Sequence, residues 1–162
     1  MIRPATPADL PGILEVYRQA RSFMARSGNP TQWGTTYPAP DLLEEDIRLG
    51  RLFVDITDGR ICGAFMFAMG DDPTYAYIEN GSWLDRSSYG VIHRVAGDGT
   101  VPGVLKRCVA FCRSQHPHLR IDTHADNHIM QKCITKEGFT FCGTIYVEDG
   151  SPRMAYEWLD TK

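Results

Sequence analysis

The chain has 162 residues, of which 43% are hydrophobic and 23% charged, a composition typical of one globular domain with its own core. Its 17 basic and 20 acidic residues give a formal net charge of -3, which argues against a broad nucleic-acid-binding surface. The apolar stretch 61–69 is too short to cross a bilayer, and the N-terminus lacks the apolar core of a secretory signal. We therefore expect a cytoplasmic protein with neither nucleic-acid nor membrane partners.

The first half of the chain predicts a strand, two helices and a β-hairpin. Residues 2–4 suit a short strand, and Thr6 with Pro7 predicts the start of a helix that reaches about residue 24. A loop over 31–40 carries Trp33 and Tyr37, and an acidic helix follows over 41–50. Residues 51–56 and 61–69 predict two strands around a turn, 74–78 an extended segment and 79–88 a loop.

The second half predicts strands that alternate with helices. Residues 91–96 read as a strand, and an amphipathic helix with its apolar positions from 101 to 112 follows a Gly-rich turn. A strand over 119–123, a helix that Asn127 caps and Gly138 ends, and strands over 139–147 and 153–158 complete the chain. The order βααβββαβαββ predicts one α/β domain over residues 1–162 with a mixed sheet.

The five cysteines are odd in number and irregularly spaced, so we expect reduced thiols. Cys108, Cys112, His116 and His118 could suggest a metal site. Cys108 and Cys112 share a helix face with apolar residues, however, and the segment lacks paired ligands at zinc spacings. We therefore expect buried core thiols and no metal.

Residues 91–106 place a Gly-rich turn between a strand and a helix. Free backbone N–H groups and the positive dipole end of a helix N-terminus bind phosphates well, and Lys106 and Arg107 add positive charge. A tight connection without a ligand explains this turn equally well.

A second segment favours phosphate binding at this turn over a simple connection. The letters DTHADN at 122–127, KEGF at 136–139 and IRPATPADLPGI at 2–13, with the order of elements, resemble the GNAT superfamily of N-acetyltransferases. The resemblance covers nearly the whole chain. Asn127, Lys136, Gly138 and Phe139 fill the positions of the family pattern.

The resemblance implies a V-shaped gap between two parallel strands that holds the pantetheine arm of acetyl-CoA. Val95 and Ala96 would then pair with pantetheine through backbone groups, and Asn127 would hydrogen-bond it. The pyrophosphate would lie at Val101, Gly103 and Val104.

Two positions depart from the family pattern. The usual pyrophosphate sequence Q/R-x-x-G-x-G/A is reduced here to GTVPGVLK, which supplies Gly103 but no second glycine at the position where the pattern expects it. Many members also carry a Tyr as the proton donor to the leaving thiolate. Ile134 occupies that position, and the adjacent Cys133 is expected to point elsewhere.

His93 and Glu79 are the candidates for the base that takes the proton of the amine. His93 lies two residues before Val95, which predicts that both share one strand face, and a histidine titrates in the useful range. A packed sheet histidine and a solvated loop acid are the alternatives, and His124 could be a structural partner of Asp122 or Asp126. Aromatic residues predict an acceptor pocket between loops 31–37 and 79–88, the second of which holds Trp83.

The predicted function is the transfer of an acetyl group from acetyl-CoA, as co-substrate, to a primary amine in a ternary complex. A backbone N–H near 95–97 would stabilise the oxyanion. The alternative is a non-catalytic acyl-CoA sensor on the same fold, whereas a dinucleotide site would need G-x-G-x-x-G. The acceptor stays open between a small molecule and a peptide, and the C-terminal strands could form a homodimer interface.

Overall fold

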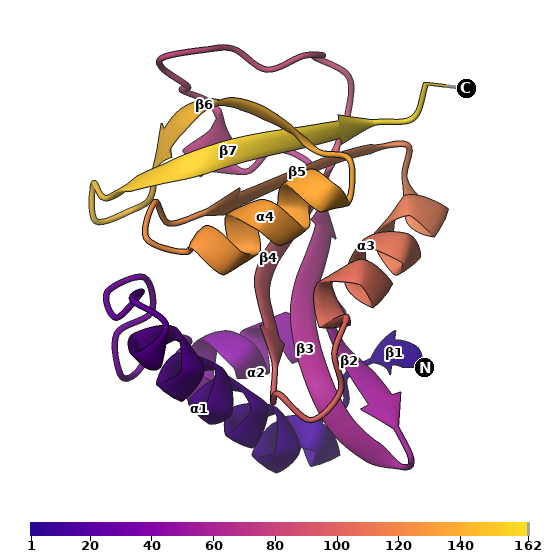
Figure 1. Cartoon of the computed structure of the whole chain (residues 1–162). Helices are drawn as coiled ribbons and strands as arrows, with labels where there is room; N and C mark the ends of the chain where they lie inside the picture. The colour runs from indigo at the N-terminus through magenta and orange to yellow at the C-terminus, as the bar shows by residue number, and fades with distance from the viewer. Residues whose placement is uncertain (162) are drawn as a thin grey trace.

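The computed structural model describes residues 1–161 and shows a seven-stranded mixed sheet with helices on both of its faces (Figure 1). The strands are β1 (Ile2–Pro4), β2 (Leu52–Thr57), β3 (Arg60–Met69), β4 (Gly90–Gly97), β5 (His118–Thr123), β6 (Thr140–Tyr146) and β7 (Pro152–Leu159). The helices are α1 (Leu10–Arg26), α2 (Pro40–Arg48), α3 (Val104–Gln115) and α4 (His128–Lys136). The predicted fold class and order of elements are confirmed.

Local chemistry explains where several elements begin. Thr6 and Asp9 form a capping box around the 3-10 turn Pro7–Asp9 that leads into α1. The Asn127 side chain accepts a hydrogen bond from the N–H of Met130 and caps α4, as predicted. Residues 73–75 form a 3-10 turn instead of an extended segment, because the Asp72 carboxylate accepts the N–H of Thr74.

The sheet has the order β1-β2-β3-β4-β5-β7-β6, and only β4 and β5 run parallel. Their pairing covers Gly90–Ile92 and Leu119–Ile121 and then stops, although β4 continues to Gly97 and β5 to Thr123. The two halves of the sheet therefore separate beyond Ile92 and Ile121. This is the V-shaped gap that the family resemblance implies.

Each face of the sheet carries its own core. Phe65, Ile92 and Ile121 pack with α3 and α4 on one face, while Val54, Ala64 and Ala96 pack with α1 and α2 on the other. Cys108 and Cys112 are buried in the first core, as predicted. No helix within residues 1–161 combines the length and apolarity that a membrane span requires.

A β-bulge interrupts β4 next to the gap. Ala64 pairs with Ala96 and Met66 with His93, so β4 carries one more residue than β3 between these pairs. Arg94 adopts a left-handed conformation with φ of 55°. His93 consequently points to the α1 and α2 face, while Val95 packs in the core under α3. The prediction that the two share a face is wrong, because the extra residue breaks the alternation.

Candidate active site

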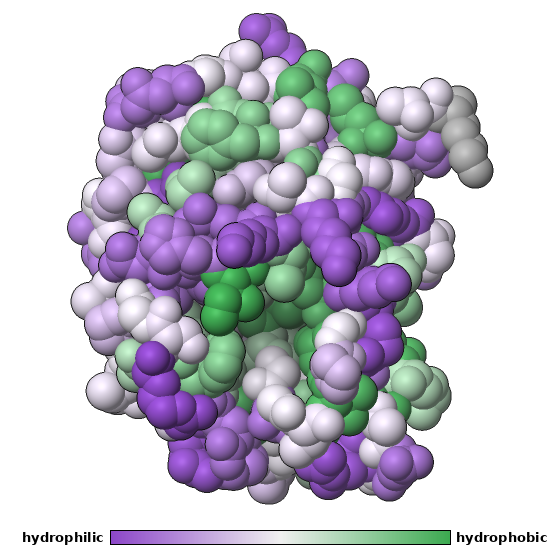
Figure 2. Space-filling view, viewed as in Figure 1, coloured by the Kyte–Doolittle hydropathy of each residue, from purple (hydrophilic) through white to green (hydrophobic). Residues whose placement is uncertain are grey.

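One cavity of about 1290 Å³ runs through the gap between β4 and β5. Its walls come from α1, the loop after α1, β3, the turn after β3, β4, the start of α3, the end of β5, α4 and the β6–β7 turn. Figure 2 shows a hollow lined by hydrophobic residues, with hydrophilic side chains around its rim. An apolar cavity of this size with a few polar groups is typical of a small-molecule site.

The cavity's α3 end has the features of an anion site. Gly103 holds a left-handed conformation with φ of 85° and caps α3 without a side-chain hydrogen bond. The first N–H groups of α3 therefore face the turn, and Val101, Gly103 and Val104 line the cavity there, at the end where the family resemblance implies the pyrophosphate. Arg107 fixes this turn by donating to the Pro102 carbonyl at 2.7 Å and the Asp55 carboxylate at 2.7 Å.

Val95 and Ala96 line the cavity along the part of β4 that has no partner on β5. Backbone groups on this edge are free to pair with an extended ligand, which suits the role that the family resemblance implies. That role stays a prediction.

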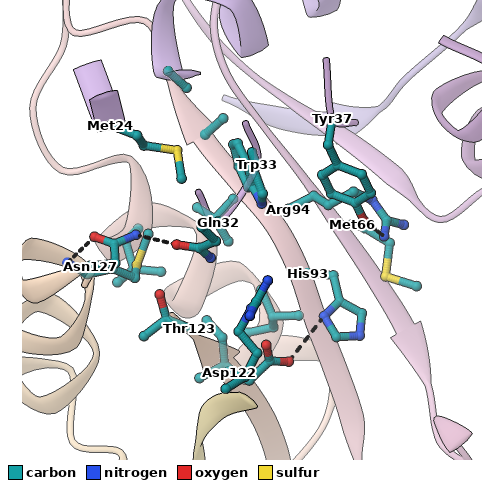
Figure 3. Close-up of a pocket in the computed structure, with 18 of the residues that line it drawn as sticks. Met24, Gln32, Trp33, Tyr37, Met66, His93, Arg94, Asp122, Thr123 and Asn127 are labelled. Atoms are coloured by element: carbon teal, nitrogen blue, oxygen red, sulfur yellow. Dashed lines mark hydrogen bonds and ion pairs between the residues drawn. The ribbon is translucent and has the colours of Figure 1, made fainter. Parts of the chain in front are cut away.

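Asn127 lies across the gap from β4 and uses both atoms of its amide (Figure 3). Oδ1 accepts the N–H of Met130, and Nδ2 donates to Oε1 of Gln32 at 3.0 Å. Gln32 also accepts from Asn29 at 2.9 Å. The loop after α1 thus reaches α4, 95 residues further along the chain. Sequence reasoning missed Gln32, since no local pattern marks it.

His93 stands where β4 leaves β5, opposite Asp122 on β5. Its Nε2 lies 2.6 Å from Oδ2 of Asp72, and its Nδ1 lies 3.6 Å from Oδ2 of Asp122, which accepts a hydrogen bond from the Tyr75 hydroxyl at 2.6 Å. Figure 3 shows His93 and Asp122 pointing toward one another. The sequence predicts His93 but misses Asp72, Asp122 and Tyr75 as its surroundings.

The surroundings of His93 shift the pKa values of Asp72 and Tyr75. Burial raises the pKa of Asp72, but hydrogen bonds from His93 and Thr74 outweigh burial and lower that pKa to about 2. Burial and the neighbouring Asp122 carboxylate raise the pKa of Tyr75 well above its ordinary value, so its hydroxyl remains a donor. A histidine that donates to one carboxylate and faces the cavity with its other nitrogen can accept a proton there.

Glu79 lies outside the set of residues that line the cavity. Its carboxylate accepts hydrogen bonds from the hydroxyls of Tyr146 and Tyr77, which lower its pKa, and its backbone pairs with Thr144. Trp83 donates its Nε1–H to the Tyr75 carbonyl at 2.9 Å. The cavity therefore reaches loop 31–37, where the sequence predicts one wall of the acceptor pocket, but it does not reach 79–88, and the turn after β3 and the β6–β7 turn form its wall instead.

A buried ion cluster holds the bulge of β4 in place. Arg94 donates to Oδ2 of Asp46 at 2.6 Å, and Arg51 donates to Oδ1 of the same carboxylate at 2.7 Å. The Tyr17 hydroxyl donates to the carbonyl of Arg94 at 2.6 Å. Both the side chain and the carbonyl of the bulge residue are thus tied to α1 and α2, which fixes how the next part of β4 faces the gap.

The position of the usual proton-donating Tyr holds no polar group. Ile134 is fully buried in the core under α3. Cys133 is exposed and lines the cavity, so its side chain points in a different direction from that of the buried Ile134. His124 accepts the N–H of Asp126 at 3.0 Å, which confirms its interpretation as a structural partner. Residues 1–161 contain no cluster of three or more His, Cys, Asp or Glu side chains that could hold a metal ion.

No protein-family model matches the chain, and no curated protein does. Among solved structures, a GNAT-family acetyltransferase from Streptococcus agalactiae is similar over 100% of this chain and 96% of its own, with 28% identity and a TM-score of 0.90. A GNAT-family acetyltransferase from Listeria monocytogenes shares the fold with 21% identity and a TM-score of 0.71, over 98% of this chain and 94% of its own.

A ribosomal-protein-alanine N-acetyltransferase from Brucella melitensis shares the fold with 22% identity and a TM-score of 0.60, over 98% of this chain and 99% of its own. The seven-stranded mixed sheet and the order of elements agree with these likenesses. The chain has the fold of the GNAT-family acetyltransferases over its whole length, and the likeness to the Streptococcus agalactiae structure supports acyl transfer as its chemistry.

Proposed function

We propose that the protein transfers an acetyl group from acetyl-CoA to a primary amine by direct reaction in a ternary complex. The observation that carries this proposal is the position of His93 and Asp122, the first residues beyond the last paired residues of β4 and β5. A thioester drawn through the gap from the α3 side reaches this pair. Asn127 and the backbone of β4 line its path.

His93 is the proposed base. Asp72 accepts the Nε2–H at 2.6 Å and so leaves Nδ1 to take a proton from an amine held beside Asp122. The amine nitrogen forms a bond to the carbonyl carbon of the thioester, and the carbon–sulfur bond breaks. The electron pair of that bond leaves with the sulfur as a thiolate, and the second proton of the attacking nitrogen passes through water to this thiolate.

The bulge of β4 supplies the second part of the chemistry. Because the Arg94 carbonyl is turned to Tyr17, the strand beyond it can offer N–H groups to the oxygen that becomes negative during attack. Holding the amine and the thioester side by side lowers the activation barrier further. The reaction requires no covalent intermediate on the protein.

The test compares His93→Gln with His128→Gln, a matched change at an exposed histidine that does not line the cavity. General bases contribute about 100-fold or more, so we expect His93→Gln to lower kcat at least 100-fold while the Kd of acetyl-CoA stays unchanged. Release of the CoA thiol measures turnover, and calorimetry measures binding. A His93→Gln protein with normal kcat and pH profile contradicts the role of His93.

The second candidate function is a sensor that binds acyl-CoA without catalysis, and the buried Ile134 in place of the usual proton donor favours it. Tight binding of acetyl-CoA without thiol release across a broad set of amines would support the sensor. A protein that binds no acetyl-CoA contradicts both functions.

A further inference from the structure

The part of the cavity on the α1 and α2 side of the gap has an apolar wall. Met24 of α1, Trp33 and Tyr37 of the following loop, and Met66 of β3 line it (Figure 3). This is the side on which His93 presents its ring, so the wall surrounds the place where an acceptor must lie to reach His93.

The wall is held in shape by contacts with residues behind it. Trp33 meets Tyr17 edge to face with ring centroids 5.7 Å apart, and it lies 6.3 Å from the ring of Tyr37. Arg94 donates to the Tyr37 hydroxyl at 3.3 Å. A pocket whose aromatic side chains are already ordered binds an apolar body without the cost of ordering them.

The same half of the cavity offers one buried place for an ammonium group. Asp122 uses Oδ2 for the Tyr75 hydroxyl, and its Oδ1 has no hydrogen-bond partner among residues 1–161. Asp72 is already engaged, since Oδ1 accepts from Thr74 and Oδ2 faces His93. Asp98, at the α3 end of the lining, is already paired with Arg60. The remaining acids of the lining are Asp71, Glu148 and Asp149, which are exposed at the rim, where a charge contributes little to binding.

A second cation on the acceptor would meet positive charge beside the wall. Arg51 and Arg94 share the single carboxylate of Asp46, so this cluster carries a net charge of about +1 next to Tyr37. Buried like charges repel each other strongly in a medium of low dielectric constant.

We propose that the acceptor is a small primary monoamine with one ammonium group and an apolar body of aromatic size. The inference rests on the proposed acetyl transfer and adds the class of amine. Asp122 holds the ammonium group beside His93, and Trp33 with Met66 covers the body.

The test measures kcat/KM for four acceptors through release of the CoA thiol. These are 2-phenylethylamine, ethylamine, spermidine and a short peptide with an apolar first residue. Burying an aromatic body is worth about tenfold or more in kcat/KM, so we expect 2-phenylethylamine to exceed ethylamine and spermidine by at least that factor. A preference for spermidine or for the peptide overturns this inference and leaves acetyl transfer standing.

Two variants of Trp33 locate the effect. Trp33→Leu keeps an apolar side chain in the packing against Tyr17, and Trp33→Ala removes the wall. We expect both to lower kcat/KM for 2-phenylethylamine, Trp33→Ala by about tenfold and mainly through KM, with a much smaller loss for ethylamine and no change in the Kd of acetyl-CoA.

Tyr146→Ala is the matched control, because Tyr146 is exposed and lies outside the cavity lining. An equal loss for both amines in either Trp33 variant overturns the inference. Failure of the unchanged protein to bind acetyl-CoA, or to acetylate any amine, overturns the proposed function itself.

Discussion

Asp46 offers the sharpest test of how the site is built. Its carboxylate is fully buried on α2 and accepts hydrogen bonds from Arg51 at Oδ1 and from Arg94 at Oδ2. Asp46→Asn keeps the volume of the side chain and removes the charge. Two guanidinium groups then face one neutral amide, whose NH2 group cannot accept a hydrogen bond from either of them.

The size of the effect follows from burial. Removing one partner of a buried ion pair costs about 3–5 kcal/mol. The Arg94 side chain is 11% exposed, whereas the Arg51 side chain is 32% exposed and can turn to water, so the lower end applies. A loss of about 3 kcal/mol corresponds to a decrease in Tm of about 6–12 °C for a domain of this size.

The same substitution should impair catalysis. Releasing Arg94 loosens the bulge of β4, and small displacements of reacting groups are costly, so we expect kcat to fall by about tenfold. The Kd of acetyl-CoA should change little, because the α3 end of the cavity is held independently by Arg107 and Asp55.

Thermal and urea unfolding measure the stability, with Asp41→Asn as the control, an exposed acid on the same helix. If the Tm of Asp46→Asn lies within about 2 °C of the unchanged protein, the ion cluster does not stabilise the fold and the reasoning fails. A destabilised variant with normal kcat would show that the ion cluster stabilises the fold but does not position the bulge for catalysis.

Three further predictions concern single residues of the cavity. Cys133 is the one exposed thiol among the five cysteines, so a thiol reagent should modify one cysteine in the native protein, and bound acetyl-CoA should protect it. Modification at the same rate with and without acetyl-CoA would mean that the ligand does not lie beside α4. Gly103→Ala forces a side chain onto a φ of 85° and should weaken acetyl-CoA binding at least tenfold, while Gly59→Ala, with a φ of 74° in a remote hairpin turn, should not. The Asp72 carboxyl, with its pKa lowered from 3.8 to about 2, contributes about 2 kcal/mol of stability that is complete above pH 3.8 and lost as the pH falls through 2. The stability gap between the unchanged protein and Asp72→Asn, measured by urea unfolding, should therefore close in that window, and a gap independent of pH would contradict this assignment.

Much of the fold could be predicted because its signals are local. Thr6 with Asp9, Asn127 with Met130, and the glycine at 103 act over a few residues of chain, and they mark where helices begin. Hydrophobic periods of two and 3.6 residues distinguish the strands from the helices in the same local way. The gap between β4 and β5 followed from family resemblance, which covers the whole chain.

The site was only partly predictable because its parts meet across the sheet. His93 was found as a residue type, but its orientation depends on a bulge defined by pairing with β3. Glu79 suited a cleft in sequence, yet two tyrosines and a bridge to Thr144 hold it elsewhere. No periodicity encodes such contacts, since they depend on strand order and register.

The sequence alone determined the order of elements, the caps of the helices and the glycine turn that begins α3. Only the tertiary structure decided which polar groups surround His93 and which residues form the acceptor wall. Arg94 meets Asp46 from 48 residues away, and Asn127 meets Gln32 from 95 residues away. Local preferences act within a turn or a strand, whereas the free energy of these pairs arises only when distant elements are packed together and water is excluded between them.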